Sequence, residues 1–128
     1  MDKATRAGLE APAMFFKALS HTSRLHMVEE LLLGEKCVLE LTALVGADMS
    51  TISKHLSVLR TAGVVVEEKR ANRVFYAIRP GETYKFVSTI PDLTRRFASE
   101  RRAAMTAARK TEVLASHRIP ATERPVAK

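Results

Sequence analysis

Residues 50–65, STISKHLSVLRTAGVV, decide the fold of this chain. Ile52, Leu56 and Leu59 fall within about 60° of one another when each residue turns the chain by about 100°, as it does in an α-helix. Gly63 can end such a helix, because glycine readily adopts the left-handed conformation that follows a last helical turn. The stretch therefore predicts a helix with one apolar face that packs on a core.

The other face of this helix is small, polar and weakly basic, and such a face can lie against the edges of base pairs. It carries Ser50, Lys54, Ser57, Val58 and Thr61, with Ser53 and Arg60 on one flank and Thr51 and His55 on the other. Ser50 or Thr51 should also cap the helix, since a hydroxyl group can accept a free backbone N–H of the first turn. Lys54 is either a DNA contact, which we favour, or a solvated lysine. His55 is either a packed, hydrogen-bonded side chain, which we favour, or a reader of bases.

Three apolar patterns upstream predict further helices. At helical spacing they cover residues 12–19, 22–33 and 38–45. Pro12 suits the first turn of the first helix, and Ser20 or Thr22 can cap the second. A break around Gly46 is too short for a linker, so the third helix leads directly into the polar-faced one.

Two runs with β-strand composition follow. VVVEEKR at 64–70 and RVFYAI at 73–78 are rich in β-branched and aromatic residues, and Asn72 can turn the chain between them. They predict a β-hairpin whose tip carries Lys69, Arg70 and Arg73. These two arginines are either ordinary turn charges or, as we expect, contacts to DNA phosphates.

Helix-forming residues predict a last helix over about 92–114. Its apolar residues recur on one side, at Leu93, Phe97, Ala104 and Ala108. The first predicted helix is also too apolar to stand exposed. We therefore expect the first and last helices to bury surface across the two-fold axis of a homodimer.

The order of these elements is that of a winged helix-turn-helix, in which the second helix of the pair enters the major groove and the hairpin reaches the adjacent backbone. We predict a mainly α fold with a small β-hairpin: four helices, the hairpin and a fifth helix. The winged domain should span residues 12–115. Residues 1–11 should form a flexible N-terminal arm, and residues 116–128 a disordered basic tail.

Composition and charge agree with a nucleic-acid partner. The 128 residues are 46% hydrophobic, which fits one domain with a core, and their net charge is +7. Residues 1–90 hold 12 basic and 10 acidic groups while residues 91–128 hold 9 and 4, so most of the excess lies in the C-terminal part. No stretch predicts a membrane span or a signal peptide, so we expect a cytoplasmic chain with no membrane partner.

Three segments match a known set of motifs. ALSHTSRL at 18–25 is similar to A-L-x-x-P-x-R-L, with Thr22 where proline is usual. ISKHLSVLRTAGVV at 52–65 is close to V-S-x-H-L-x-x-L-x-x-A-G-L-V, and RANRVFY at 70–76 is similar to R-x-G-R-x-V-Y-Y. In this order they resemble the ArsR/SmtB family of winged-helix repressors. The resemblance implies a homodimeric repressor that binds a double-stranded operator with an inverted repeat and is released by an unidentified signal.

The resemblance also implies which residues of the polar-faced helix contact DNA. The family's base-facing and phosphate-facing positions fall here on Ser50, Ser53 and Lys54, with Thr51 and Ser57 as additions. Met49 stands where many members have glutamine. A thioether cannot hydrogen-bond a base edge as an amide does, so the operator preference should differ at this position.

The sensing segment departs from the family. Residues 35–42 read EKCVLELT where arsenic-sensing members have E-L-C-V-C-D-L-C, so one thiol of three remains, and the segment holds no three-thiolate site for arsenic or antimony. Cys37 and Glu40 keep the C-x-x-D spacing of some zinc-type sensors, but residues 1–13 supply neither cysteine nor histidine. We therefore expect no metal and no cofactor. For Cys37 we favour a small buried side chain over a redox-active thiol or a metal ligand.

Two other functions deserve comparison. A protein-binding winged helix with only non-specific nucleic-acid affinity would leave Ser53 and Lys54 dispensable for DNA binding. An enzyme would need a Gly-rich phosphate loop, paired carboxylates or a Cys/His arrangement, and the sequence has none with recognisable spacing. We therefore predict a sequence-specific, DNA-binding transcriptional regulator and not an enzyme.

Overall fold

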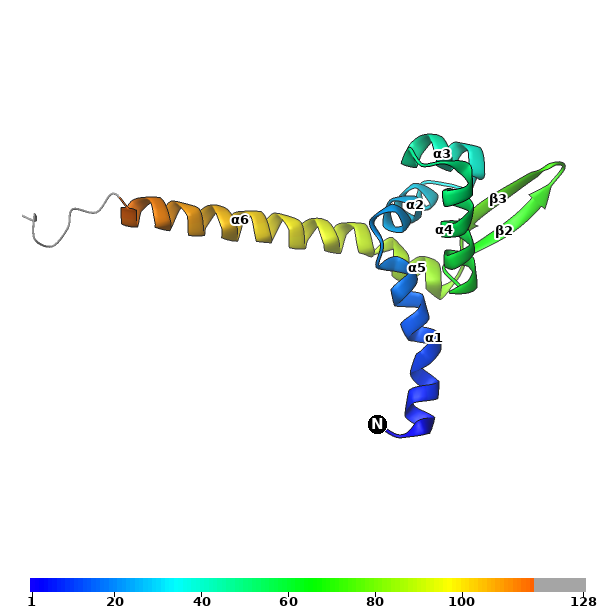
Figure 1. The fold of residues 1–128 in the computed structure, drawn as a ribbon, viewed down its shortest axis with the longest axis horizontal. Coiled ribbons are helices and arrows are strands. Elements are labelled where there is room, and N and C mark those ends of the chain that lie inside the picture. Colours follow the sequence, from blue (N-terminus) through cyan, green and yellow to red (C-terminus); the bar gives the residue numbers. More distant parts are fainter. Residues whose placement is uncertain (117–128) are drawn as a thin grey trace, which may run out of the picture. The chain divides into compact units, whose positions relative to one another are not determined.

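The computed structural model describes residues 1–116, and Figure 1 labels their helices and the strands β2 and β3. In chain order these are α1 (Lys3–Leu19), α2 (Thr22–Leu32), β1 (Lys36–Cys37), α3 (Val38–Val45), α4 (Met49–Thr61), β2 (Val65–Arg70), β3 (Arg73–Ile78), α5 (Glu82–Ser88) and α6 (Ile90–Ser116). The mainly helical fold with a small antiparallel sheet confirms the predicted fold class. The chain divides into two compact units, one of residues 1–89 and one that begins at Ile90.

α1 begins at Lys3 and not at Pro12, so the predicted start of this helix is wrong. The Asp2 carboxylate caps it by accepting the backbone N–H of Thr5 at 2.7 Å, and Pro12 lies in the helix interior. Residues 3–11, which we expected to form a flexible arm, are helical, although all their side chains are exposed. The proline pattern was misleading because a capping aspartate ten residues earlier supplies the helix start.

The helices around the core follow the prediction more closely. α2 and α3 lie within one residue of their expected bounds. The cap of α2 is different, since the ring Nδ1 of His21, and not Ser20 or Thr22, accepts the backbone N–H of Ser23 at 3.1 Å. Gly46 ends α3 with a φ of 78°, the left-handed conformation that permits the tight turn into α4.

The apolar face of α4 is the centre of the core of residues 1–89. Ile52, Leu56 and Leu59 have no solvent exposure, as their spacing predicted. α4 packs against α1, α2, α3 and β2. The other buried apolar residues are Ala18, Leu19, Met27, Val28, Leu31, Cys37, Leu41, Val64, Val65, Ile78 and Val87. This packing fixes the orientation of α4, so its polar face must lie on the outside.

The sheet has the strand order β1-β3-β2, and all its pairs are antiparallel. β2 and β3 form the predicted hairpin, which we call the wing, with Val65 opposite Ile78 and Arg70 opposite Arg73. The left-handed residue of the turn is Ala71, with a φ of 52°, and not Asn72. The prediction missed β1, which pairs with β3 across a long stretch of sequence, and the short helix α5.

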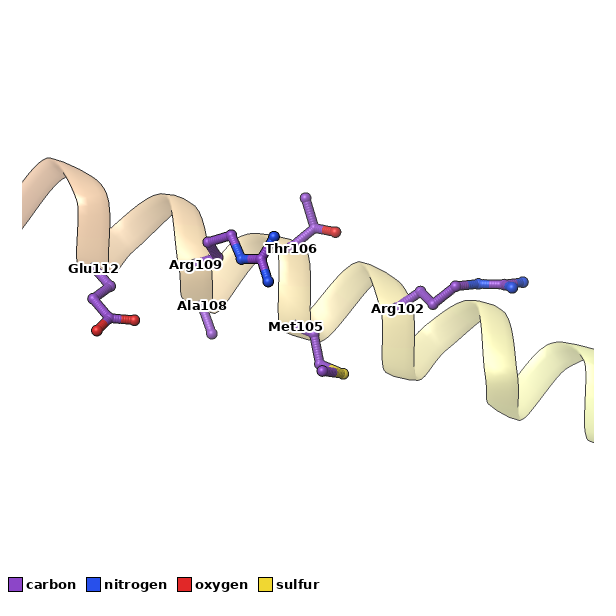
Figure 2. A pocket seen from close by; sticks show the side chains of 6 residues that line it. All are labelled: Arg102, Met105, Thr106, Ala108, Arg109 and Glu112. Carbon is purple, nitrogen blue, oxygen red and sulfur yellow. The ribbon is translucent and has the colours of Figure 1, made fainter.

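α6 is longer than the predicted helix over 92–114 and ends at Ser116, the last described residue. The rest of the predicted disordered tail lies outside the described residues. No side chain of α6 is buried, and Leu93 and Phe97 are among its exposed large apolar residues. Figure 2 shows that Met105, Ala108 and Glu112 project from the same side of α6. No helix among the described residues is both long enough and apolar enough to cross a bilayer.

Candidate nucleic-acid interface

The predicted DNA-contacting residues of α4 lie together on the face opposite the core. Their side chains are exposed, or half-buried in one case: Ser50, Ser53, Lys54 and Ser57 are exposed and Thr51 is half-buried. The opposite face of α4 is packed in the core, so the packing fixes the direction in which these side chains point. Hydroxyl groups and a long cation are groups that can hydrogen-bond base edges and phosphates.

The start of α4 is capped by Asp48, which lies two residues after Gly46. Its Oδ1 accepts the backbone N–H of Thr51 at 2.7 Å and the hydroxyl of Ser50 at 3.2 Å. The predicted caps, Ser50 or Thr51, are therefore wrong. The hydrogen bonds from Thr51, and then from Ser50, lower the pKa of Asp48, so the cap is a carboxylate. The signal was present, because aspartate three residues before a helical N–H is a common capping pattern.

The C-terminal part of α4 is tied to the wing. The Arg60 guanidinium forms an ion pair with the Glu67 carboxylate of β2, at 2.5 Å between Nη1 and Oε1. Tyr76 of β3 joins this group, since burial and then a hydrogen bond to Glu67 raise its pKa. Arg60 lies on the flank of the predicted polar face, and its engagement with Glu67 links the orientation of the wing to that of α4.

The two wing arginines differ in their surroundings. Arg70 forms an ion pair with Glu35, and its guanidinium carbon lies 4.1 Å from the centre of the Phe75 ring. The hydrogen bond to Glu35 raises the pKa of Arg70. Arg73 is exposed, and no hydrogen bond or ion pair within residues 1–116 engages its guanidinium. Contact of Arg70 with phosphate would compete with its ion pair to Glu35, whereas the charge of Arg73 only adds to the lowering of the Glu40 pKa that hydrogen bonds from Cys37 cause.

His55 lies on the inner flank of α4, where it contacts residues of α2 and its cap. Its Nδ1 is 3.4 Å from Nη1 of Arg24, and its ring centre is 4.7 Å from that of His21. The side chain is half-buried. This is the packed, hydrogen-bonded arrangement that we favoured for His55.

The thiol of Cys37 is free and buried, with 7% of the residue exposed. Its backbone N–H donates to Oε1 of Glu40 at 3.2 Å, and hydrogen bonds from the thiol and the backbone of Cys37 lower the pKa of Glu40. Cys37 thus stands at the N-cap of α3 as a small, buried side chain. Among the described residues no three histidine, cysteine or acidic side chains come together as metal ligands.

Replacing Cys37 with serine should therefore leave DNA binding and its response to zinc, cadmium, arsenite and peroxide unchanged. We expect a modest loss of stability of about 1 kcal/mol, because a hydroxyl group costs more to bury than a thiol. Urea unfolding and gel-shift titrations with each agent measure the two effects. If one agent releases the wild-type complex but not the variant complex, Cys37 is a sensing thiol.

Sequence comparison gives relatives for most of the chain. A family profile described as "Bacterial regulatory protein, arsR family" matches residues 21–66. The uncharacterized HTH-type transcriptional regulator Rv0081 of Mycobacterium tuberculosis is 33% identical over 94 residues, which are 73% of this chain and 82% of the relative. The biofilm growth-associated repressor of Xylella fastidiosa is 33% identical over 78 residues, which are 61% of this chain and 68% of the relative.

Solved structures of related regulators also resemble this chain. The crystal structure of Rv0081 matches with a TM-score of 0.65 and 29% identity, over 79% of this chain and 98% of that chain. The solution structure of a homodimeric winged helix-turn-helix DNA-binding domain from Mycobacterium bovis matches with a TM-score of 0.70 and 22% identity, over 78% and 93% of the two chains. The second likeness shows the winged helix-turn-helix fold.

Proposed function

The chain belongs to the arsR family of bacterial regulatory proteins, and from this premise we propose that it is a dimeric repressor that binds a specific operator and leaves it on an unidentified signal. As a family member it is a DNA-binding transcriptional regulator and not an enzyme. One observation carries the proposal. α4 combines a stripe of side chains without solvent exposure and an opposite, exposed polar face with Lys54 near its middle.

In this proposal α4 enters the major groove as the recognition helix and the wing lies along the neighbouring backbone. The residues of α4 that contact DNA are Ser50, Thr51, Ser53, Lys54 and Ser57. On the wing, Arg73 contacts phosphate, and Arg70 does so when it exchanges Glu35 for DNA. The cytoplasm, where a bacterial operator lies, is the proposed location.

The proposed dimer follows from the apolar residues that α1 and α6 leave exposed. Phe16 of α1 is 56% exposed, and Phe97 of α6 is 59% exposed. Large exposed apolar surfaces of this kind mark contact sites between proteins. Two copies related by a two-fold axis would present two recognition helices to an inverted repeat, with half-sites about one helical turn apart.

Immunoprecipitation of the protein with bound genomic DNA tests the proposal directly. We expect enrichment of a small number of promoter fragments that share an inverted repeat, and tighter binding to that repeat than to a scrambled duplex. The alternative, a protein-binding winged helix with only non-specific nucleic-acid affinity, predicts equal binding to the two duplexes.

Replacing Arg73 with alanine should weaken binding to the operator and to scrambled duplex by the same factor. Arg73 is expected to contact only phosphate, so the variant should also make the dependence of log affinity on log salt shallower by about one unit. Titrations of both duplexes at several salt concentrations measure this. Arg79→Ala, which removes an exposed arginine at the other end of β3, is the matched control and should change the slope less. A loss confined to the operator would instead make Arg73 a reader of sequence.

A further inference from the structure

One guanidinium joins the end of α1 to the recognition helix. Arg24, in the first turns of α2, donates from Nε to the backbone carbonyl of Ala18 at 2.6 Å and from Nη2 to that of Lys17 at 3.4 Å. Its remaining nitrogen, Nη1, lies 3.4 Å from Nδ1 of His55 in the middle of α4. Arg24 is half-buried, so this geometry is held by its surroundings.

The contact between Arg24 and His55 requires a particular protonation state. A guanidinium only donates hydrogen bonds, so Nδ1 of His55 must carry no proton. The neighbouring ring of His21 uses its Nδ1 to accept the backbone N–H of Ser23 at 3.1 Å. The imidazole of His55 is therefore neutral in this arrangement. A second proton on this ring would replace an acceptor with a donor and place a new positive charge beside Arg24.

The groups around His55 all disfavour its charged form. The elements packed against α4 are α1, α2, α3 and β2. Burial, and then His21 and Arg24 on the α2 side, lower the pKa of His55, and no carboxylate among the described residues offsets them. A lowered pKa in the folded state means that the arrangement is stable above the ordinary histidine pKa and loses stability as the pH falls below it.

We propose that Arg24 is a positioning residue for DNA recognition, which holds α4 against the end of α1 through the neutral ring of His55, and that acidification releases this hold. The inference rests on the proposed function, since its effect is read in operator binding. It assigns Arg24 no contact with DNA. The proposal implies that the preference for the operator over scrambled duplex becomes weaker as the pH falls.

The measured quantity is the ratio of operator affinity to scrambled-duplex affinity, in which the general attraction of protonated histidine to phosphate largely cancels. In wild type we expect this ratio to fall about five- to tenfold between about pH 8 and about pH 5, the range in which histidine changes its charge. His55→Asn places an uncharged acceptor near the position of Nδ1, so it should keep most of the ratio at pH 8 and remove its pH dependence. Arg24→Gln should lower the ratio at pH 8 about tenfold and also flatten the profile.

His26→Asn is the matched control. His26 lies on α2, but its ring Nε2 lies 3.4 Å from the carbonyl of Leu44, outside the Arg24 group. This variant should keep the wild-type pH profile. Circular dichroism at each pH shows whether Arg24→Gln has folded. Nitrogen NMR of the histidine rings in wild type, without DNA, gives an independent result, since Nδ1 of His55 should carry no proton at pH 8.

The possible outcomes separate the two proposals. A wild-type ratio that is constant from pH 8 to pH 5, or a His55→Asn profile that keeps the wild-type slope, would overturn the role of Arg24 alone. A His55 ring protonated on Nδ1 at pH 8 would overturn it as well. A protein that prefers no duplex at any pH would overturn the proposed function, and the role of Arg24 with it.

Discussion

Replacing Lys54 with alanine should weaken binding to the operator by about 1 to 3 kcal/mol more than binding to scrambled duplex, a difference of about 5- to 150-fold in affinity. Lys54 is exposed near the middle of the polar face of α4, where a long cation can reach a guanine edge. The buried stripe behind it leaves the helix no other orientation. Titrations of wild type and variant against both duplexes measure the effect.

Lys85→Ala is the control for this experiment. Lys85 is an exposed lysine of α5 that pairs with Glu82 at 3.2 Å, so its loss removes the same charge away from the proposed interface. It should change both affinities slightly and equally. If Lys54→Ala lowers the two affinities by the same factor, Lys54 contacts phosphate and the sequence is read by other side chains.

Replacing Phe97 with glutamate should abolish dimerisation and reduce operator affinity more than about 100-fold. Phe97 is 59% exposed on the apolar side of α6, and a buried, unpaired carboxylate at a subunit interface is strongly unfavourable. A monomer presents one recognition helix, so it loses the gain from binding two half-sites of one operator. Sedimentation at micromolar concentration and operator titration measure the two effects.

Ser99→Glu introduces the same charge two residues later, about 160° around the helix axis from Phe97. This control should remain dimeric and bind the operator as wild type does. A wild-type chain that sediments as a monomer at micromolar concentration would contradict the dimer and remove the reason to expect an inverted repeat.

Local sequence patterns were sufficient for most of the winged domain. The apolar spacing of α4, the glycine that ends α3 and the two β-branched runs of the wing each act over a few residues, and their elements lie where they were expected apart from the start of α4. The exposed face of α4 could be predicted for the same reason, because burying Ile52, Leu56 and Leu59 forces the opposite side chains outward.

Contacts between residues far apart in the sequence could not be predicted from local patterns. β1 is two residues long and exists because it pairs with β3, where Cys37 lies opposite Phe75. The ion pair between Glu35 and Arg70 and the contact between Arg24 and His55 join residues more than thirty positions apart. Local patterns cannot distinguish the two wing arginines, whereas in the part of the chain that the structure describes Arg70, and not Arg73, forms an ion pair with a carboxylate.

Pro12 divides α1 into two halves that differ in stability, although both halves are helical. Proline has no backbone N–H, so the helical acceptor four residues earlier, the carbonyl of Gly8, has no intrahelical donor at that point. Residues before Pro12 bury no side chain, whereas Ala18 and Leu19 at the other end of the helix are buried in the core. The first half of α1 can therefore unwind at a small free-energy cost while the second half stays folded. Amide hydrogens of residues 3–11 should exchange with solvent through local opening, and those near Leu19 only when the whole unit unfolds.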